Sequence, residues 1–201
     1  MLFRFLLTYS HSHRFLSVAA FVMRLVSQKA FRGASKLAKA ALASGLGLIA
    51  LTATYLIMPW EGIENHAYYD NLGSVWTVCL GETRGLKKGD RYTDKQCQVM
   101  LIKNLEAGFR QPLRKCIRTF DQAPISVQAS MLDLSYNVGT GAACKSTAVK
   151  RLADKQWRLA YHAMTAFDRA GCKAVEGLRK RREMDDSKRI GELELCLVAL
   201  E

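Results

Sequence analysis

An uncharged run constrains this chain more than any other feature. Residues 40–60 read AALASGLGLIALTATYLIMPW and carry no charged side chain over 21 positions. A helix of about 20 mostly apolar residues is long enough to cross a bilayer. Basic residues precede the run and the first acid, Glu61, follows it, which orients the N-terminus toward the cytoplasm. We therefore expect a transmembrane signal-anchor helix over 40–60.

The anchor is expected to stay uncleaved and to be weakly held. Pro59 leads directly into Glu61, which leaves no room for the small-residue cleavage site of a signal peptide. Ten of the 21 residues are Ala, Gly, Ser or Thr, so transfer of the run out of lipid has a small free-energy cost. An ordinary permanent anchor is the alternative.

The chain divides into three parts around this run. Residues 1–39 form a basic segment, in which apolar clusters alternate with Arg and Lys and no acid occurs. This segment is either a membrane-surface helix, or its first 22 residues precede a true start at Met23. Residues 61–201 form one domain, and the hydrophobic content of 49% is ample for its core.

The charge balance points to a polyanionic partner. The net charge is +12, from 30 basic and 18 acidic residues, which suits nucleic acid, anionic lipid or an acidic cell-wall polymer. The excess of basic residues is split between the N-terminal flank of the uncharged run and the cluster of arginines and lysine at 179–182. No basic stripe with an aromatic platform is visible, so we do not expect nucleic-acid binding. Nothing indicates more than a monomer.

All six cysteines follow the uncharged run. An even number confined to one side of an anchor indicates an exported, disulfide-bonded domain, although a set of small buried hydrophobes is the alternative. Six cysteines allow fifteen pairings, so the sequence does not reveal the connectivity. No CxxC spacing occurs, which argues against a zinc or thioredoxin-type site. The disulfide candidates are Cys79, Cys97, Cys116, Cys144, Cys172 and Cys196.

The stretch 60–83 carries the candidate catalytic groups. Glu61 and Asp70 lie nine residues apart, and alternating residues broken by glycines predict a short β-hairpin from Asp70 onward. Two carboxyls across a cleft can break a glycosidic bond if one stays protonated and the other ionised. The apolar neighbours of Glu61 favour its protonated form, whereas Asp70 has polar neighbours, and Thr77 can orient a water.

The same stretch resembles the signature of phage-type lysozymes, glycoside hydrolase family 24. The resemblance lies in Glu61-Gly62, Ala67-Tyr68, Asp70, Gly73, Val75-Trp76-Thr77-Val78-Cys79 and Gly81-Glu82-Thr83. It continues to about residue 189 through Tyr92-Thr93-Asp94, Ser135-Tyr136-Asn137-Val138-Gly139, Ser146-Thr147, Gly177-Leu178 and Arg181-Arg182-Glu183. In one respect the chain departs from the family: seven residue steps, not six, separate the Asp from the Thr. Ser74 is the extra residue, and we expect a bulge there.

The resemblance implies an α+β, mainly α, lysozyme-like fold with a small β-hairpin lobe. It implies a muramidase that inverts configuration without metal or cofactor, with Glu61 as general acid and with Asp70 and Thr77 holding the attacking water. Its substrate would be the peptidoglycan glycan strand. Further substrate contacts are expected from Asn137, Arg179 and Arg182. Arg179, Arg181 and Arg182 could each contact the glycan or the Glu61 carboxylate, but we expect at least two of these three arginines to lie on a solvated face.

The position of the uncharged run also resembles the signal-arrest-release segments of some phage endolysins. There an anchor holds the enzyme inactive in the host inner membrane and later withdraws, releasing it into the periplasm. We expect this localisation, with the domain on the periplasmic side. Two rival functions stay open: a catalytically inactive, membrane-anchored peptidoglycan-binding protein whose water site Ser74 has spoiled, and a basic protein that lyses cells by disrupting lipid through residues 1–60.

Helices are expected around the hairpin. Thr93 is a predicted N-cap for a helix over about 94–109, and a second helix over about 126–138 is the best core candidate, ended by Gly139. Only His66 and His162 follow the anchor, too few for a zinc amidase.

Overall fold

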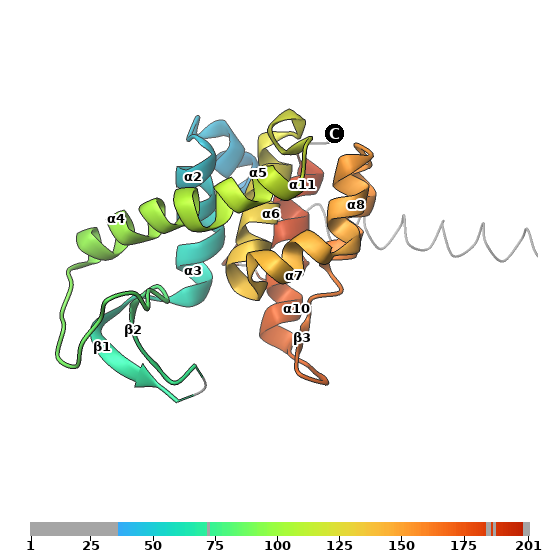
Figure 1. The fold of residues 1–201 in the computed structure, drawn as a ribbon. Helices are drawn as coiled ribbons and strands as arrows, with labels where there is room; N and C mark the ends of the chain where they lie inside the picture. Colours follow the sequence, from blue (N-terminus) through green and yellow to red (C-terminus); the bar gives the residue numbers. More distant parts are fainter. Residues whose placement is uncertain (1–35, 72, 184–185, 187, 199–201) are drawn as a thin grey trace, which may run out of the picture.

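A computed structural model describes residues 36–71, 73–183, 186 and 188–198. Most of the predicted basic segment 1–39 lies outside these residues. The described chain forms a helical body from which a β-hairpin over residues 64–79 projects, and helix α4 (Asp94–Asn104) runs from this hairpin lobe back to the body (Figure 1). The mainly helical fold with a small hairpin, predicted from the sequence, is confirmed.

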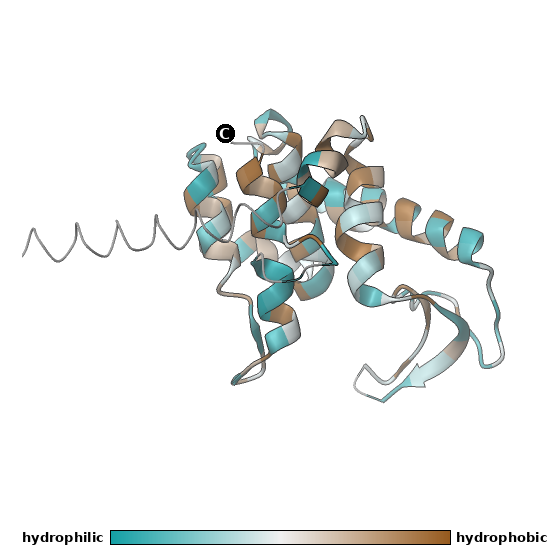
Figure 2. Ribbon diagram, turned by 180° about the vertical axis from the view of Figure 1, so that it is seen from behind, coloured by the Kyte–Doolittle hydropathy of each residue, from teal (hydrophilic) through white to brown (hydrophobic). Residues whose placement is uncertain are grey.

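Helix α6 (Ile125–Val138) is the centre of the body, and nine of its residues are buried. It follows Pro124, and it ends at Gly139, whose φ of 84° is unfavourable for other residues. The helix predicted over 126–138 is therefore confirmed. Figure 2 shows apolar residues recurring along the helices of the body, interleaved with hydrophilic ones.

Several of the other helical segments pack directly against α6. After α4 the chain continues through the π-helical segment η2 (Leu105–Arg110) into α5 (Gln111–Cys116), then the 3₁₀ turn η3 (Phe120–Gln122). Beyond α6 follow α7 (Thr140–Lys145), α8 (Thr147–Ala153), α9 (Trp157–Met164), the small hairpin β3 (Arg169–Ala170) and β4 (Lys173–Ala174), α10 (Glu176–Arg182) and α11 (Glu192–Val198).

The uncharged run does not form one continuous helix. Residues 36–43 are helical, residues 44–47 are not, and Gly45 has a φ of 68° that interrupts the helix. Helix then resumes as α2 (Leu48–Leu51), the π-helical segment η1 (Thr52–Ile57) and α3 (Met58–Glu61). Within the described ranges, no helix is both long enough and apolar enough to span a membrane. The prediction of one continuous helix over 40–60 is wrong in this respect, because the helix is interrupted at residues 44–47.

This run instead supplies part of the core. Leu51, Leu56 and Ile57 are at most 1% exposed, and η1 and α2 pack against α6. Small residues allow this close approach: Ala53 is buried, and the buried Thr52 hydroxyl donates to the Leu48 carbonyl at 2.8 Å. Side chains of the uncharged run that were expected to contact lipid therefore contact α6 in the structure.

The hairpin lobe consists of β1 (Glu64–Asp70), β2 (Val75–Cys79) and the loop that leads to α4. A capping box starts α4, because Thr93 accepts from the Gln96 backbone while Gln96 accepts from the Thr93 backbone. The predicted N-cap is thus confirmed. The helix predicted to reach 109 continues as the π-helical segment η2 and α5.

Four cysteines form two disulfides. Cys79 bonds Cys97 and fastens the end of β2 to α4, while Cys116 bonds Cys144 and joins α5 to α7. The remaining two disulfide candidates carry free thiols, Cys172 exposed in the β3–β4 turn and Cys196 buried in α11.

Leu56→Ala tests whether the uncharged run belongs to the core. Leu56 is 0% exposed, so its truncation leaves a cavity, and we expect the free energy of unfolding to fall by about 2–5 kcal/mol. Leu159→Ala is the matched control, because Leu159 is 49% exposed and its loss should change stability by less than about 0.5 kcal/mol. Urea unfolding of the oxidised protein measures both, and equal effects would contradict the packing described.

Glu194→Gln tests a buried acid in α11. Burial raises the pKa of Glu194 from 4.5 to about 7, against the opposing hydrogen bond from the Gly191 backbone N–H. The folded state therefore binds a proton more tightly than the unfolded state, so this stabilisation is complete below pH 4.5 and is lost as the pH rises to about 7. A tenfold difference in proton affinity is worth about 1.4 kcal/mol, which limits the loss to about 3.5 kcal/mol at most. Denaturant unfolding between pH 4.5 and 8 should show a flatter decline for Glu194→Gln, and an unchanged decline would refute the assignment.

Candidate active site

Glu61 is the last residue of α3, where the helical body meets the hairpin lobe (Figure 1). Gly62 ends the helix with a φ of 72°, a conformation that favours glycine, and the chain turns there into β1. The neighbouring Trp60 is fixed because its indole N–H donates to the Ile190 carbonyl at 3.0 Å and the Arg189 guanidinium lies over its ring. The Glu61 side chain is 30% exposed, so it remains accessible from solvent.

Arg181 of α10 holds the Glu61 carboxylate. Its Nη1 donates to Glu61 Oε1 at 2.5 Å, while its Nε and Nη2 donate to the two carboxylate oxygens of Asp133 at 3.1 and 2.7 Å. Arg181 is 4% exposed and Asp133 is fully buried. Burial lowers the pKa of the Arg181 guanidinium, but Asp133 and Glu61 together raise it above its ordinary value. Arg181 is therefore a permanent cation shared by the two acids.

Asp70 and Thr77 lie on one face of the hairpin. The register pairs Asp70 with Val75 and Tyr68 with Thr77, and residues two apart on a strand share a face. Thr77 is 6% exposed, and its hydroxyl donates to the Val75 carbonyl at 3.4 Å. Asp70, Thr77 and Tyr68 are thus brought to the same face of the sheet.

Ser74 does not form the expected bulge between Asp70 and Thr77. It lies in the turn with a φ of 51°, and the pairing from Asp70–Val75 to Tyr68–Thr77 is regular. The irregularity of this hairpin lies elsewhere, between Glu64 and Tyr68. A Cβ on Gly73 would lie 3.1 Å from Asp70 Oδ2, so the turn depends on glycine for its close approach to the carboxylate. The extra residue is accommodated without shifting the strands.

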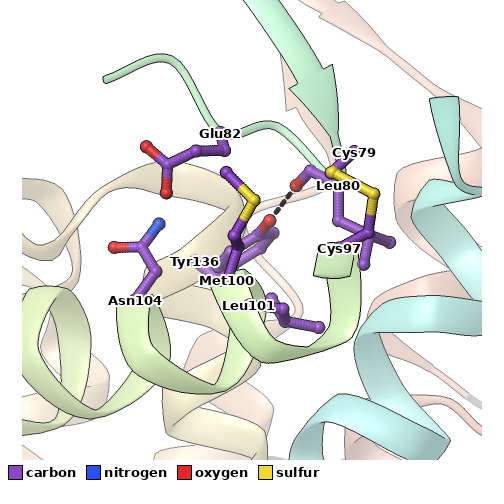
Figure 3. Close-up of a pocket in the computed structure, with 8 residues that line it drawn as sticks. All are labelled: Cys79, Leu80, Glu82, Cys97, Met100, Leu101, Asn104 and Tyr136. Carbon is purple, nitrogen blue, oxygen red and sulfur yellow. Dashed lines mark hydrogen bonds between the residues drawn. A yellow bond between two sulfur atoms is a disulfide. The ribbon is translucent and has the colours of Figure 1, made fainter. Parts of the chain in front are cut away.

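Tyr136 joins the hairpin lobe to the central helix. Its hydroxyl donates to the Leu80 carbonyl directly after β2, and its ring lies 5.1 Å from that of Phe109. Figure 3 shows this contact next to the Cys79–Cys97 disulfide, around a cavity of about 10 Å³ that holds one water at most. Burial, and next the charge of Glu61, raises the pKa of Tyr136, so its hydroxyl stays protonated as a donor. Two links therefore fix the lobe at this joint.

The three predicted substrate-binding residues have different surroundings. Arg182 is fully buried: it donates to the Phe167 carbonyl at 3.2 Å and to the side chains of Asn137 and Glu192. Asn137 is part-buried at the end of α6. Arg179 of α10 is half-buried and forms ion pairs with Glu176 and Glu183. The expectation that at least two of Arg179, Arg181 and Arg182 lie on a solvated face is wrong, because Arg181 and Arg182 are buried.

Sequence reasoning missed two acids of this site, Asp133 and Glu192. Both are fully buried, Asp133 on α6 and Glu192 at the start of α11. The available signal was an acid inside an apolar helical pattern, Met131-Leu132-Asp133-Leu134, because such an acid needs a buried partner. Among the residues that the structure describes, no group of three or more potential ligands is arranged to hold a metal ion.

The arrangement provides two carboxyl groups with different environments. Glu61 contacts a buried guanidinium and reaches solvent, whereas Asp70 shares a face with Thr77 on the hairpin that follows. A proton donor on one element and a water-orienting pair on another are the groups that acid-catalysed hydrolysis requires.

Known proteins resemble this chain in sequence and in fold. A family model described as phage lysozyme matches residues 58–185. The SAR-endolysin of Enterobacteria phage P21 is 31% identical over 162 residues, which cover 78% of this chain and 92% of the relative. The SAR-endolysin of Pseudomonas phage phiKMV is 34% identical over 153 residues, covering 73% and 86%.

Solved structures share the fold at lower identity. The active form of P1 phage endolysin Lyz has a TM-score of 0.62 and 21% identity, over 82% of this chain and 93% of that one. The muramidase domain of SpmX from Asticaccaulis excentricus has a TM-score of 0.57 and 18% identity, over 73% and 92%. The predicted lysozyme-like fold is confirmed by these likenesses.

Proposed function

The chain belongs to the phage lysozyme family, and we propose that it is an endolysin that hydrolyses the β-1,4 bond between N-acetylmuramic acid and N-acetylglucosamine in peptidoglycan. Its role is the lysis of a Gram-negative host cell. It acts on the glycan strand as a monomer, without nucleic acid as a partner.

In the proposed reaction, Glu61 protonates the leaving oxygen of the glycosidic bond. Asp70 accepts a proton from a water that the Thr77 hydroxyl helps to orient, and this water attacks the sugar from the opposite face, which inverts its configuration. Bond cleavage thus uses one proton from Glu61 and returns one to Asp70. Exchange with solvent, which the exposure of Glu61 permits, restores both groups.

One observation carries this proposal. Asp70 and Thr77 share a face of the β1–β2 hairpin in a regular register, and this hairpin starts three residues after Glu61. The regular pairing supports a water site at Asp70 and Thr77 rather than one that Ser74 has spoiled, which was the basis for proposing a catalytically inactive wall-binding protein.

We further propose that residues 40–60 first anchor the chain in the host inner membrane and then withdraw, releasing the domain into the periplasm. Relatives that share about 30% identity are named SAR-endolysins, which supports this localisation. The core position of Leu51, Leu56 and Ile57 supports it physically, because burial against α6 offsets the loss of lipid contact. Residues 61–201 would then be the catalytic domain, and 1–39 its basic leader.

Glu61→Gln tests the reaction. Gln cannot donate the proton, so clearing of purified peptidoglycan by the full chain should fall at least about 100-fold. Glu64→Gln is the matched control, since Glu64 is exposed, pairs among the described residues with His66 at 3.7 Å, and should clear like wild type. Turbidity of a sacculus suspension is the measurement.

Three other outcomes separate the alternatives. Equal clearing by Glu61→Gln and wild type would refute the role of Glu61. A folded, oxidised wild type that binds sacculi without clearing them would favour an inactive wall-binding protein. Lysis of intact cells by Glu61→Gln would favour membrane disruption.

A further inference from the structure

Tyr68 lies on the same face of the hairpin as the two groups proposed to hold the attacking water. The register of β1 and β2 places Tyr68 directly opposite Thr77, and Asp70 opposite Val75. Residues two apart on a strand point to the same side, about 7 Å from each other, and opposite residues have Cβ atoms about 5 Å apart. The hairpin therefore carries the Tyr68 side chain next to those of Asp70 and Thr77.

The ring of Tyr68 is open to solvent on this face. The residue is 48% exposed, which is high for an aromatic side chain beside a proposed water site. Among the described residues, ring contacts join Tyr69 to Trp76 and Phe109 to Tyr136, and Tyr68 takes part in neither. The apolar surface of this ring is thus available to a molecule that lies on the hairpin.

Tyr69, the next residue of β1, has different surroundings. It is 49% exposed, but it faces the other side of the hairpin, where it is paired with Trp76. The two ring centroids are 5.6 Å apart and the ring planes meet at 71°, an edge-on contact that stabilises neighbouring strands. Tyr69 therefore contributes to the packing of the lobe, whereas the ring of Tyr68 does not contribute in this way.

The backbone that carries Tyr68 is fixed from two sides. Tyr68 is the first residue of the regular pairing with β2, after the register shift within β1. Directly before it, β1 bonds a loop instead: the Ala67 N–H donates to the Asp90 carbonyl at 2.9 Å, and His66 forms a bridge with Arg91. A tyrosine on a fixed backbone has few torsions to order when a ligand covers it, so little conformational entropy is lost on binding.

A sugar ring is a suitable ligand for such a side chain. The faces of a pyranose ring present C–H groups, and covering one face with an aromatic ring removes apolar surface from water on both partners. The phenol hydroxyl can stay hydrated while the ring is covered. A sugar on Tyr68 would lie at, or next to, the sugar that is attacked by the water of Asp70 and Thr77.

We propose that Tyr68 is a substrate-binding residue, whose ring stacks on a sugar of the glycan strand beside the Asp70–Thr77 water site. This inference rests on the proposed function. It deepens that function by placing the glycan strand along the catalytic face of β1.

Tyr68→Ala tests the proposal in the full chain. The substrate is soluble, uncross-linked peptidoglycan strands, and new reducing ends are the readout. Loss of a stacked ring removes binding that the ground state and the transition state share, so KM should rise about tenfold while kcat stays within about threefold of wild type. Tyr68→Phe keeps the ring and should keep KM within about twofold.

Tyr69→Ala is the matched control, because it makes the same change at the next residue of β1 with nearly the same exposure. It also removes the ring contact with Trp76. A merely structural role of the two tyrosines therefore predicts the larger effect for Tyr69→Ala, whereas stacking on a sugar predicts that KM rises in Tyr68→Ala alone. An unchanged KM in Tyr68→Ala, or an equal or larger rise in Tyr69→Ala, would overturn the proposal.

A binding measurement separates this proposal from the proposed function. Glu61→Gln is expected to leave the strands intact, so isothermal titration calorimetry can report their affinity for the full chain. Adding Tyr68→Ala should weaken this affinity about tenfold and adding Tyr69→Ala should not, and equal affinities would overturn the proposal. A wild type that binds the strands without cleaving them would refute the proposed function, and the same comparison would still decide the role of Tyr68. A wild type that does not bind them would overturn both.

Discussion

The double ion pair of Arg181 is the interaction on which the site depends. It joins the end of α3 to the centre of α6 through one buried guanidinium, with hydrogen bonds of 2.5 to 3.1 Å to two carboxylates. Removing one partner of such a pair leaves an uncompensated buried charge, a loss of about 3–5 kcal/mol. The position of Glu61 is therefore determined by the packing of α6 and α10 as much as by its own helix.

The hairpin lobe is positioned by different means. The Tyr136–Leu80 hydrogen bond and the Cys79–Cys97 disulfide fix its base, while the turn at its tip contains the extra residue Ser74. A hairpin whose register is set below the turn can accept an insertion at the turn without moving its strands. This explains how the chain departs from the family spacing between Asp70 and Thr77 and yet keeps both on one face.

The structural features that could be predicted from the sequence are those that depend on the residue types of a short local stretch. The Thr93 cap, the end of α6 at Gly139 and the existence of the hairpin follow from residue types that act on their own backbone. Burial of Arg182 and the partnership of Asp133 with Arg181, 48 residues apart, could not be predicted because they depend on tertiary packing. The uncharged run shows the same limit: its composition suits a bilayer and a protein core equally, and Gly45 interrupts its helix in the structure.

We propose that this fold cleaves the glycan strand by hydrolysis in which Glu61 is the general acid, and the sugar at each new chain end tests this directly. Sacculi digested with the full chain can be reduced with borohydride, and the sugar at each new end identified by mass spectrometry. We expect reduced N-acetylmuramic acid at every new end, accumulating with wild type and not with Glu61→Gln. New ends on N-acetylglucosamine, or clearing without any new reducing end, would contradict it.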